Sequence, residues 1–170
     1  MTTKTVAILL FPDVLMLDVA GPIEVFSVAN RYLPESDHYR IVTLGAESLS
    51  VRASNGIVMQ ADQLAVDAPV AYDTLLVPGG PGAYNERHPH LYGWLREAAQ
   101  ASRRHGAVCT GAFILGEAGL LDGHRVTTHW HYLDRLAKRF PKAQLETDLL
   151  FTKDGKLLSS GGVTAGIDLA

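Results

Sequence analysis

Cys109 is the only cysteine among the 170 residues, and small residues flank it. It ends a short apolar run, with Ala107 two residues before it and Gly111 two residues after it. Small flanking residues are typical of a nucleophile elbow, a tight turn from a strand into a helix. A helix N-terminus would also lower the pKa of the thiol below the ~8.5 of free cysteine. The alternative is a buried, unreactive cysteine, which is the commoner role of a lone cysteine.

A run of glycine and proline, Pro78–Gly82, follows the apolar stretch Thr74–Val77. The backbone N–H groups of Gly79 and Gly80, together with that of Thr110, could stabilise a developing oxyanion. The alternative is a flexible turn. The run is neither a phosphate loop nor a dinucleotide fingerprint, because no Gly-Lys-Ser/Thr follows and the third glycine of the fingerprint is missing.

Asp18 is an acidic residue inside the apolar stretch Leu15–Ala20, in the loop that we expect after the first strand. A carboxyl group close to Cys109 could take or give a proton. Asp18 could equally cap the helix that we expect to open near Gly21. Glu24, on that helix, is the competing carboxylate.

Two His-x-His pairs occur in the chain, and each could bind a metal. They are His88 with His90 and His129 with His131. Neither pair is accompanied in the sequence by a cluster of Asp, Glu or Cys, so we expect no metal site and no cofactor.

Short apolar strands alternate with helices along the chain, and this order predicts the fold. Val6–Phe11, Thr74–Val77 and Ala107–Cys109 are continuous apolar runs, as expected for adjacent central strands covered on both faces. We expect an α/β fold with a doubly wound, mainly parallel sheet and helices on both faces, in which a ligand binds beyond the carboxyl ends of the strands. The other expected elements are a strand at Tyr39–Leu44, helices over Gly21–Asn30, from Leu91 to near Gly106, over Gly111–Ala118 and over Leu133–Phe140, and hairpins around Asn55-Gly56 and Asp154-Gly155.

The composition limits the classes of partner. The 170 residues are 47% hydrophobic and 19% charged, with a net charge of −3, so we expect one globular domain. Such a chain is not expected to bind duplex DNA by itself, and Trp94 and Trp130 are expected to pack in the interior. No apolar run is long enough to span a bilayer and the N-terminus does not read as a signal peptide, which predicts a soluble, cytoplasmic protein without a membrane partner. Thr164–Ala170 looks like the start of a helix without a stop signal, which predicts a fragment cut in its last helix.

Several motifs together resemble the PfpI-type class I glutamine amidotransferase-like superfamily, over essentially the whole chain. The most specific segments are Val108–Ala112 and Thr127–Trp130. Two branches are similar: the isocyanide hydratases, and the N-terminal sensor domain of AraC-type (GlxA-like) transcriptional regulators, which Gly21–Asn30 favours. The other segments that carry the resemblance are Phe11-Pro12, Leu17-Asp18, Val77–Gly80, Ala118–Gly123, Arg139–Pro141 and Gly162–Asp168.

The resemblance implies roles for single residues. Cys109 matches the superfamily's nucleophile, and Asp18 matches the acid near it. Gly80 and Thr110 match the backbone donors on the oxyanion side, and His129 falls on a position near the cysteine in some members.

Two activities of the superfamily are not expected. Its proteases place a histidine directly after the cysteine, where this chain has Thr110. Its glutamine amidotransferases use a late His/Glu pair, which the stretch Gly161–Thr164 lacks.

The resemblance also implies a function. The first expectation is a sensor domain that binds a small-molecule effector, forms a homodimer and is joined to a helix-turn-helix region beyond residue 170. The second is a hydratase-type lyase, in which Cys109 attacks an electrophilic carbon and Asp18 moves the proton. A flavodoxin-like flavin binder ranks third, because the loop after the first strand lacks a Ser/Thr-rich phosphate nest.

Overall fold

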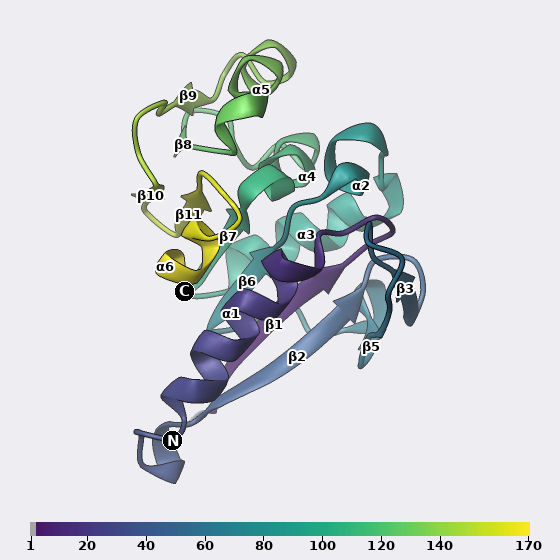
Figure 1. The fold of residues 1–170 in the computed structure, drawn as a ribbon, viewed down its shortest axis with the longest axis vertical. Coiled ribbons are helices and arrows are strands. Elements are labelled where there is room, and N and C mark those ends of the chain that lie inside the picture. Colours follow the sequence, from purple (N-terminus) through teal and green to yellow (C-terminus); the bar gives the residue numbers. More distant parts are fainter. Residues whose placement is uncertain (1–2) are drawn as a thin grey trace.

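A seven-stranded sheet forms the centre of the computed structural model, which describes residues 3–170. Every pairing in this sheet is parallel except that of β10 with β11. The strands β7, β6 and β1 lie side by side in the middle, which confirms the three expected central strands (Figure 1). The expected bounds near the cysteine are wrong, because the preceding helix ends at Ala101 and the strand runs over Arg104–Val108, which leaves Cys109 outside it. In spatial order the strands are β10 (Phe151–Asp154), β11 (Leu157–Ser160), β7 (Arg104–Val108), β6 (Thr74–Val77), β1 (Lys4–Leu10), β2 (Tyr39–Gly45) and β5 (Gln63–Leu64).

Helices cover both faces of the sheet. The helix α1 lies beside α6 on one face, and α3 lies on the other (Figure 1). No helix within residues 3–170 is both long and apolar enough to cross a membrane. The α-helices are α1 (Met16–Ala29), α2 (Pro81–Asn85), α3 (Pro89–Ala101), α4 (Ala112–Glu117), α5 (Leu133–Arg139) and α6 (Ala165–Leu169).

The first helix begins earlier than the sequence predicts. It starts at Met16, and Pro22 lies inside it, whereas the Gly21-Pro22 pair predicts a start near Gly21. Proline has no N–H to donate to the carbonyl four residues earlier, and that carbonyl belongs to Asp18. The helix continues past the proline because its buried face, which includes Val19 and Phe26, packs on the sheet.

Two predicted hairpins are present. Gly56 and Gly155 both have a positive φ, as their tight turns require. The first turn joins β3 (Ser50–Arg52) to β4 (Val58–Gln60), and the second joins β10 to β11. A further short pair that the sequence did not indicate is β8 (Arg125–Val126) with β9 (Gln144–Leu145).

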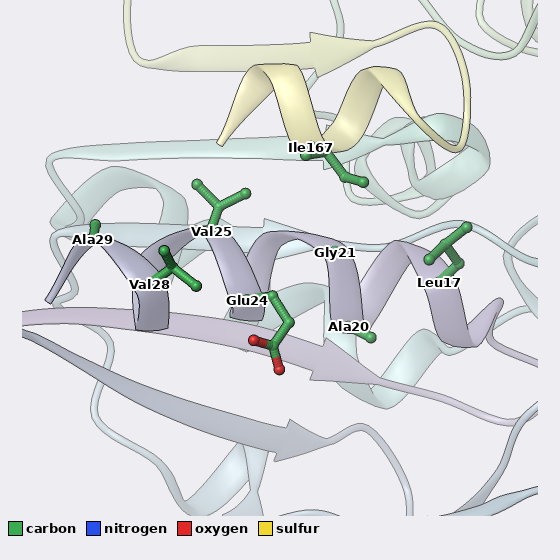
Figure 2. A pocket seen from close by; sticks show the side chains of 8 residues that line it. All are labelled: Leu17, Ala20, Gly21, Glu24, Val25, Val28, Ala29 and Ile167. Atoms are coloured by element: carbon green, nitrogen blue, oxygen red, sulfur yellow. The ribbon is translucent and has the colours of Figure 1, made fainter. Parts of the chain in front are cut away.

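The helices α1 and α6 approach each other closely at Gly21. A Cβ atom built on Gly21 would lie 2.9 Å from Cγ1 of Ile167, which is closer than packed carbon atoms approach. Figure 2 shows Ile167 between the two helices, opposite Gly21. The last helix is therefore held directly against the first.

Candidate functional site: a cysteine elbow at the carboxyl edge of the sheet

Cys109 lies at the point where β7 ends and the chain turns into α4. It opens a 3₁₀ turn, Cys109–Gly111, and has a φ of +54°. A positive φ is uncommon for a residue other than glycine and is often found where a turn holds a functional side chain. The side chain is 5% exposed. The structure thus places the cysteine in a strained turn at the edge of the sheet where ligands bind in such folds.

Two hydroxyl groups hold the backbone of this turn. The N–H of Cys109 donates to Oγ of Ser160 on β11, at 3.3 Å. Oγ1 of Thr128 donates to the carbonyl of Cys109, at 2.8 Å. Hydrogen bonds to both ends of one residue fix its orientation relative to the neighbouring strand.

Sequence reasoning did not single out Ser160. The only signal in the sequence was weak, the pattern Leu-Leu-Ser-Ser that ends in Ser160, and the structure shows that both serines are buried in this short strand. Polar side chains at such positions need internal partners. The small residue expected after the cysteine is Gly111, and the structure explains why it is small. A Cβ there would overlap the carbonyl oxygen of Val77.

Asp18 is buried in the first turn of α1, with only 1% of its surface exposed. Its Oδ2 accepts the N–H of Gly79 at 2.9 Å. The carboxyl therefore neither lies in a loop nor caps the helix, and both of those expectations are wrong. Oδ1 has no hydrogen-bond partner within residues 3–170. Burial raises the pKa of this carboxyl to about 7, against the smaller effect of the Gly79 hydrogen bond.

The glycine loop is tied to these side chains. Gly80 donates its N–H to Oγ1 of Thr110 at 2.9 Å, and Gly79 donates to Asp18. Both N–H groups thus have internal acceptors in this structure. A Cβ on Gly79 would lie 2.7 Å from the Asp18 carboxylate and 2.7 Å from the Thr110 hydroxyl. The loop therefore passes directly between the acid and the residue that follows the cysteine.

The Cys109 thiol does not have the low pKa that its place in the turn predicts. Burial, with a smaller contribution from the charge of Asp18, raises its pKa to about 12, although the N–H and hydroxyl of Thr110 act to lower it. The expectation of a lowered pKa is wrong because burial outweighs the donors. The Asp18 contribution requires an ionised carboxylate, so it disappears when Asp18 is protonated.

A cavity of about 390 Å³ opens onto the thiol, and we call it the elbow pocket. His129 lines it, as the resemblance implies. The Nδ1 atom of His129 accepts the N–H of His131 at 3.2 Å, and burial lowers the pKa of the His129 ring. A neutral His129 then carries its proton on Nε2. The other residues around the pocket are Leu15, Ser54, Gly80, Pro81, Tyr84, Thr110, Trp130, His131, Tyr132 and Val163.

The two tryptophans differ in their surroundings. Trp94 packs in the interior and donates its Nε1–H to the carbonyl of Ala68, as expected. Trp130 is 73% exposed, so the expectation that it packs inside is wrong. Its indole ring stacks on the imidazole of His129, with centroids 5.6 Å apart, and is in a T-shaped arrangement with the ring of His131.

Glu24, the competing carboxylate, is exposed and lies outside the elbow pocket. It borders a groove of about 660 Å³ that runs along α1 and is otherwise apolar. Figure 2 shows Leu17, Val25 and Val28 along this groove, with Ile167 beside it. Within residues 3–170, no three side chains of His, Cys, Asp or Glu are grouped in a way that could hold a metal ion.

The sequence pattern of one family matches residues 4–170, and the cysteine elbow lies inside that match. The chain belongs to the DJ-1/PfpI family. The resemblance drawn from the motifs is thereby confirmed. The fold is also confirmed, because a solved AraC family transcriptional regulator from Pseudomonas putida superposes with a TM-score of 0.84 at 25% identity, covering 98% of this chain and 88% of that chain.

Two curated relatives of this chain correspond to the two expected kinds of protein. The HTH-type transcriptional regulator CdhR of Pseudomonas aeruginosa is 36% identical over 161 residues, which are 95% of this chain and 47% of CdhR. The isonitrile hydratase of Pseudomonas putida is 34% identical over 166 residues, which are 97% of this chain and 68% of that enzyme. The chain thus spans about half the length of the regulator that it matches.

Proposed function

We propose that this chain is the ligand-sensing and dimerisation domain of an AraC-type transcriptional regulator. In this proposal the elbow pocket receives a small-molecule effector. DNA is contacted through a helix-turn-helix region outside these 170 residues.

The similarity to regulators over nearly the full chain supports the proposal most directly. CdhR aligns with 95% of this chain, and the AraC family structure covers 98% of it. The chemistry of the pocket agrees with a binding role, because the thiol has a pKa of about 12 and both N–H groups of Gly79 and Gly80 are used internally. Such a pocket is better suited to holding a ligand than to rapid nucleophilic attack at neutral pH.

The reading frame beyond Ala170 tests the proposal. A basic continuation that contains two helix-turn-helix patterns is the expected result. The full-length protein should then shift a DNA duplex from its own promoter region, and deletion of the continuation should abolish the shift. A stop codon shortly after Ala170 would refute the proposal.

A hydratase is the second candidate, favoured by the buried acid near the thiol and by the 34% identity to isonitrile hydratase. In the proposed reaction the Cys109 thiolate adds to the terminal carbon of the isonitrile, and that carbon takes a proton from Asp18. Water then adds to the same carbon and the thiol leaves, which gives an N-substituted formamide.

Incubation with cyclohexyl isocyanide distinguishes this candidate. Formation of N-cyclohexylformamide by the wild-type chain, but not by Cys109→Ser, would favour the enzyme. No product above the uncatalysed rate would favour the sensor.

A further inference from the structure

A second cavity lies next to the elbow pocket, and Trp130 lines both. It has a volume of about 320 Å³. The chain also connects the two cavities at a second place, because Val163 lines the elbow pocket while Gly162 and Thr164 line the second cavity. The two cavities thus share the indole ring and one short segment as walls.

The second cavity has a single charged side chain in its lining. That residue is Asp148, an exposed acid in the segment between β9 and β10. No ion pair joins its carboxylate to a cation in the part of the chain that the structure describes. No lysine or arginine lines either cavity. Arg135 is engaged with Tyr84, over its ring and on its carbonyl. The charge in the second cavity therefore favours a cation.

The remaining walls suit an organic cation better than a metal ion. Trp130 presents a largely exposed indole, and Leu149 and Leu150 are 43% and 68% exposed. The face of an indole attracts an ammonium group, and the apolar side chains can cover the carbon chain that carries it. A metal ion would need several oxygen or nitrogen ligands, and Asp148 is the only carboxylate in the lining.

We propose that the two cavities form one two-part ligand site. The elbow pocket receives the head of the ligand, and the second cavity receives an ammonium group on a short tail, between the Trp130 indole and the Asp148 carboxylate. The ligand class is therefore a small organic molecule with a cationic tail. This inference rests on the proposed function, because it requires that the elbow pocket admits a ligand.

Thiol reagents with different tails test the site, because Cys109 is the only cysteine. Alkyl methanethiosulfonates form a mixed disulfide with the thiolate and release methanesulfinate. Tails of two to six methylene groups that end in ammonium, hydroxyl or sulfonate would be compared. Each rate would be divided by the rate of the same reagent with free cysteine, which removes the intrinsic reactivity of the reagent.

The ammonium reagents should react several-fold faster than the hydroxyl reagents after this correction, and the sulfonates should be slowest. The preference should peak at one tail length. Asp148→Asn should reduce the preference for ammonium at least threefold, and Trp130→Leu should also reduce it. Asp67→Asn, which removes an exposed acid outside both cavities, should leave it unchanged.

Equal corrected rates for all three tails would overturn the two-part site while leaving the elbow pocket as a ligand site. A preference that persists in Asp148→Asn would overturn it as well. A Cys109 that no reagent modifies even at pH 9, in the wild type or in Asp18→Asn, where the charge that raises the thiol pKa is absent, would refute both the two-part site and the elbow pocket of the proposed function. Circular dichroism of each variant would confirm that it is folded.

Discussion

Asp18 and Cys109 form a buried acid–thiol pair whose protonation depends on both groups. The carboxyl has a pKa of about 7 and the thiol a pKa of about 12. Below pH 7 the pair holds two protons, and above it the carboxylate disfavours a thiolate beside it. Both groups are buried in a space with few donors, and Oδ1 of Asp18 lacks a partner within residues 3–170. The protonated carboxyl is therefore the form that this site accommodates best.

The first prediction at the residue scale concerns stability. The folded pKa of Asp18 lies above its ordinary value of 3.8, so between pH 3.8 and about 7 the folded chain binds a proton that the unfolded chain has lost. The contribution of Asp18 to the free energy of unfolding therefore falls as pH rises through this window and is constant above it. Across the whole window, the shift in the pKa of Asp18 corresponds to a loss of at most about 4 kcal/mol in the free energy of unfolding.

Asp18→Asn should remove this dependence. Urea unfolding at pH 5 and pH 8 measures it, and the wild type should lose more stability between the two values than the variant does. His105, whose pKa burial lowers to about 4, changes stability in the opposite direction but is present in both proteins, so it cancels in the comparison. Parallel pH profiles of wild type and variant would contradict the prediction.

The second prediction concerns the reactivity of the thiol. Asp18→Asn removes the negative charge that raises the pKa of Cys109, so alkylation by iodoacetamide at pH 8 should be several-fold faster in the variant. At pH 5.5, where the wild-type carboxyl is protonated, the two rates should converge. Glu24→Gln, a change in an exposed acid outside the elbow pocket, is the matched control. A slower rate in Asp18→Asn at pH 8 would mean that the carboxyl activates the thiol.

At the scale of elements, the sequence predicted the central strands and both hairpins. Continuous apolar runs and the Asn-Gly and Asp-Gly turns are local signals, so no distant contact was needed to recognise them. The start of α1 was missed because Pro22 is a strong local signal that tertiary packing overrides. The helix α2 was missed because Pro81 and Gly82 read as a turn. The exposure of Trp130 depends on which segments lie near it, and neighbouring residues in the sequence do not determine that.

The third prediction concerns the contact between α1 and α6. Gly21→Val would place two methyl groups against Ile167, whose Cγ1 already lies 2.9 Å from a Cβ built on Gly21. This overpacking should lower the free energy of unfolding by about 1–3 kcal/mol. Gly93→Ala, in α3, has open space around its Cβ and should stabilise the chain by about 0.5–1 kcal/mol. Thermal unfolding measures both changes. If Ile167→Ala does not restore stability to Gly21→Val, the predicted clash is not the cause.

At the scale of the whole molecule, a sensor domain of the proposed kind acts by pairing. Two DNA-binding regions joined through their domains bind neighbouring half-sites with a high effective concentration. The fourth prediction is therefore that residues 1–170 sediment at micromolar concentration with twice the monomer mass of 18.4 kDa. A single species at the monomer mass over that range would count against a dimerisation role.

The last prediction concerns DNA. Phosphate contacts supply most of the affinity for a duplex, and they need an excess of lysine and arginine. This chain has 15 basic and 18 acidic residues, so it lacks such an excess. Within residues 3–170, three arginines are in addition paired with acids, among them Arg103 with Asp73 and Arg125 with Glu146. Residues 1–170 alone should therefore give no specific shift of a duplex at physiological salt, whereas the proposed full-length regulator should. The opposite result is a shift by residues 1–170 that competitor DNA of random sequence fails to remove. It would place a DNA-binding surface within these 170 residues and would contradict the proposal that DNA is contacted only through a region outside them.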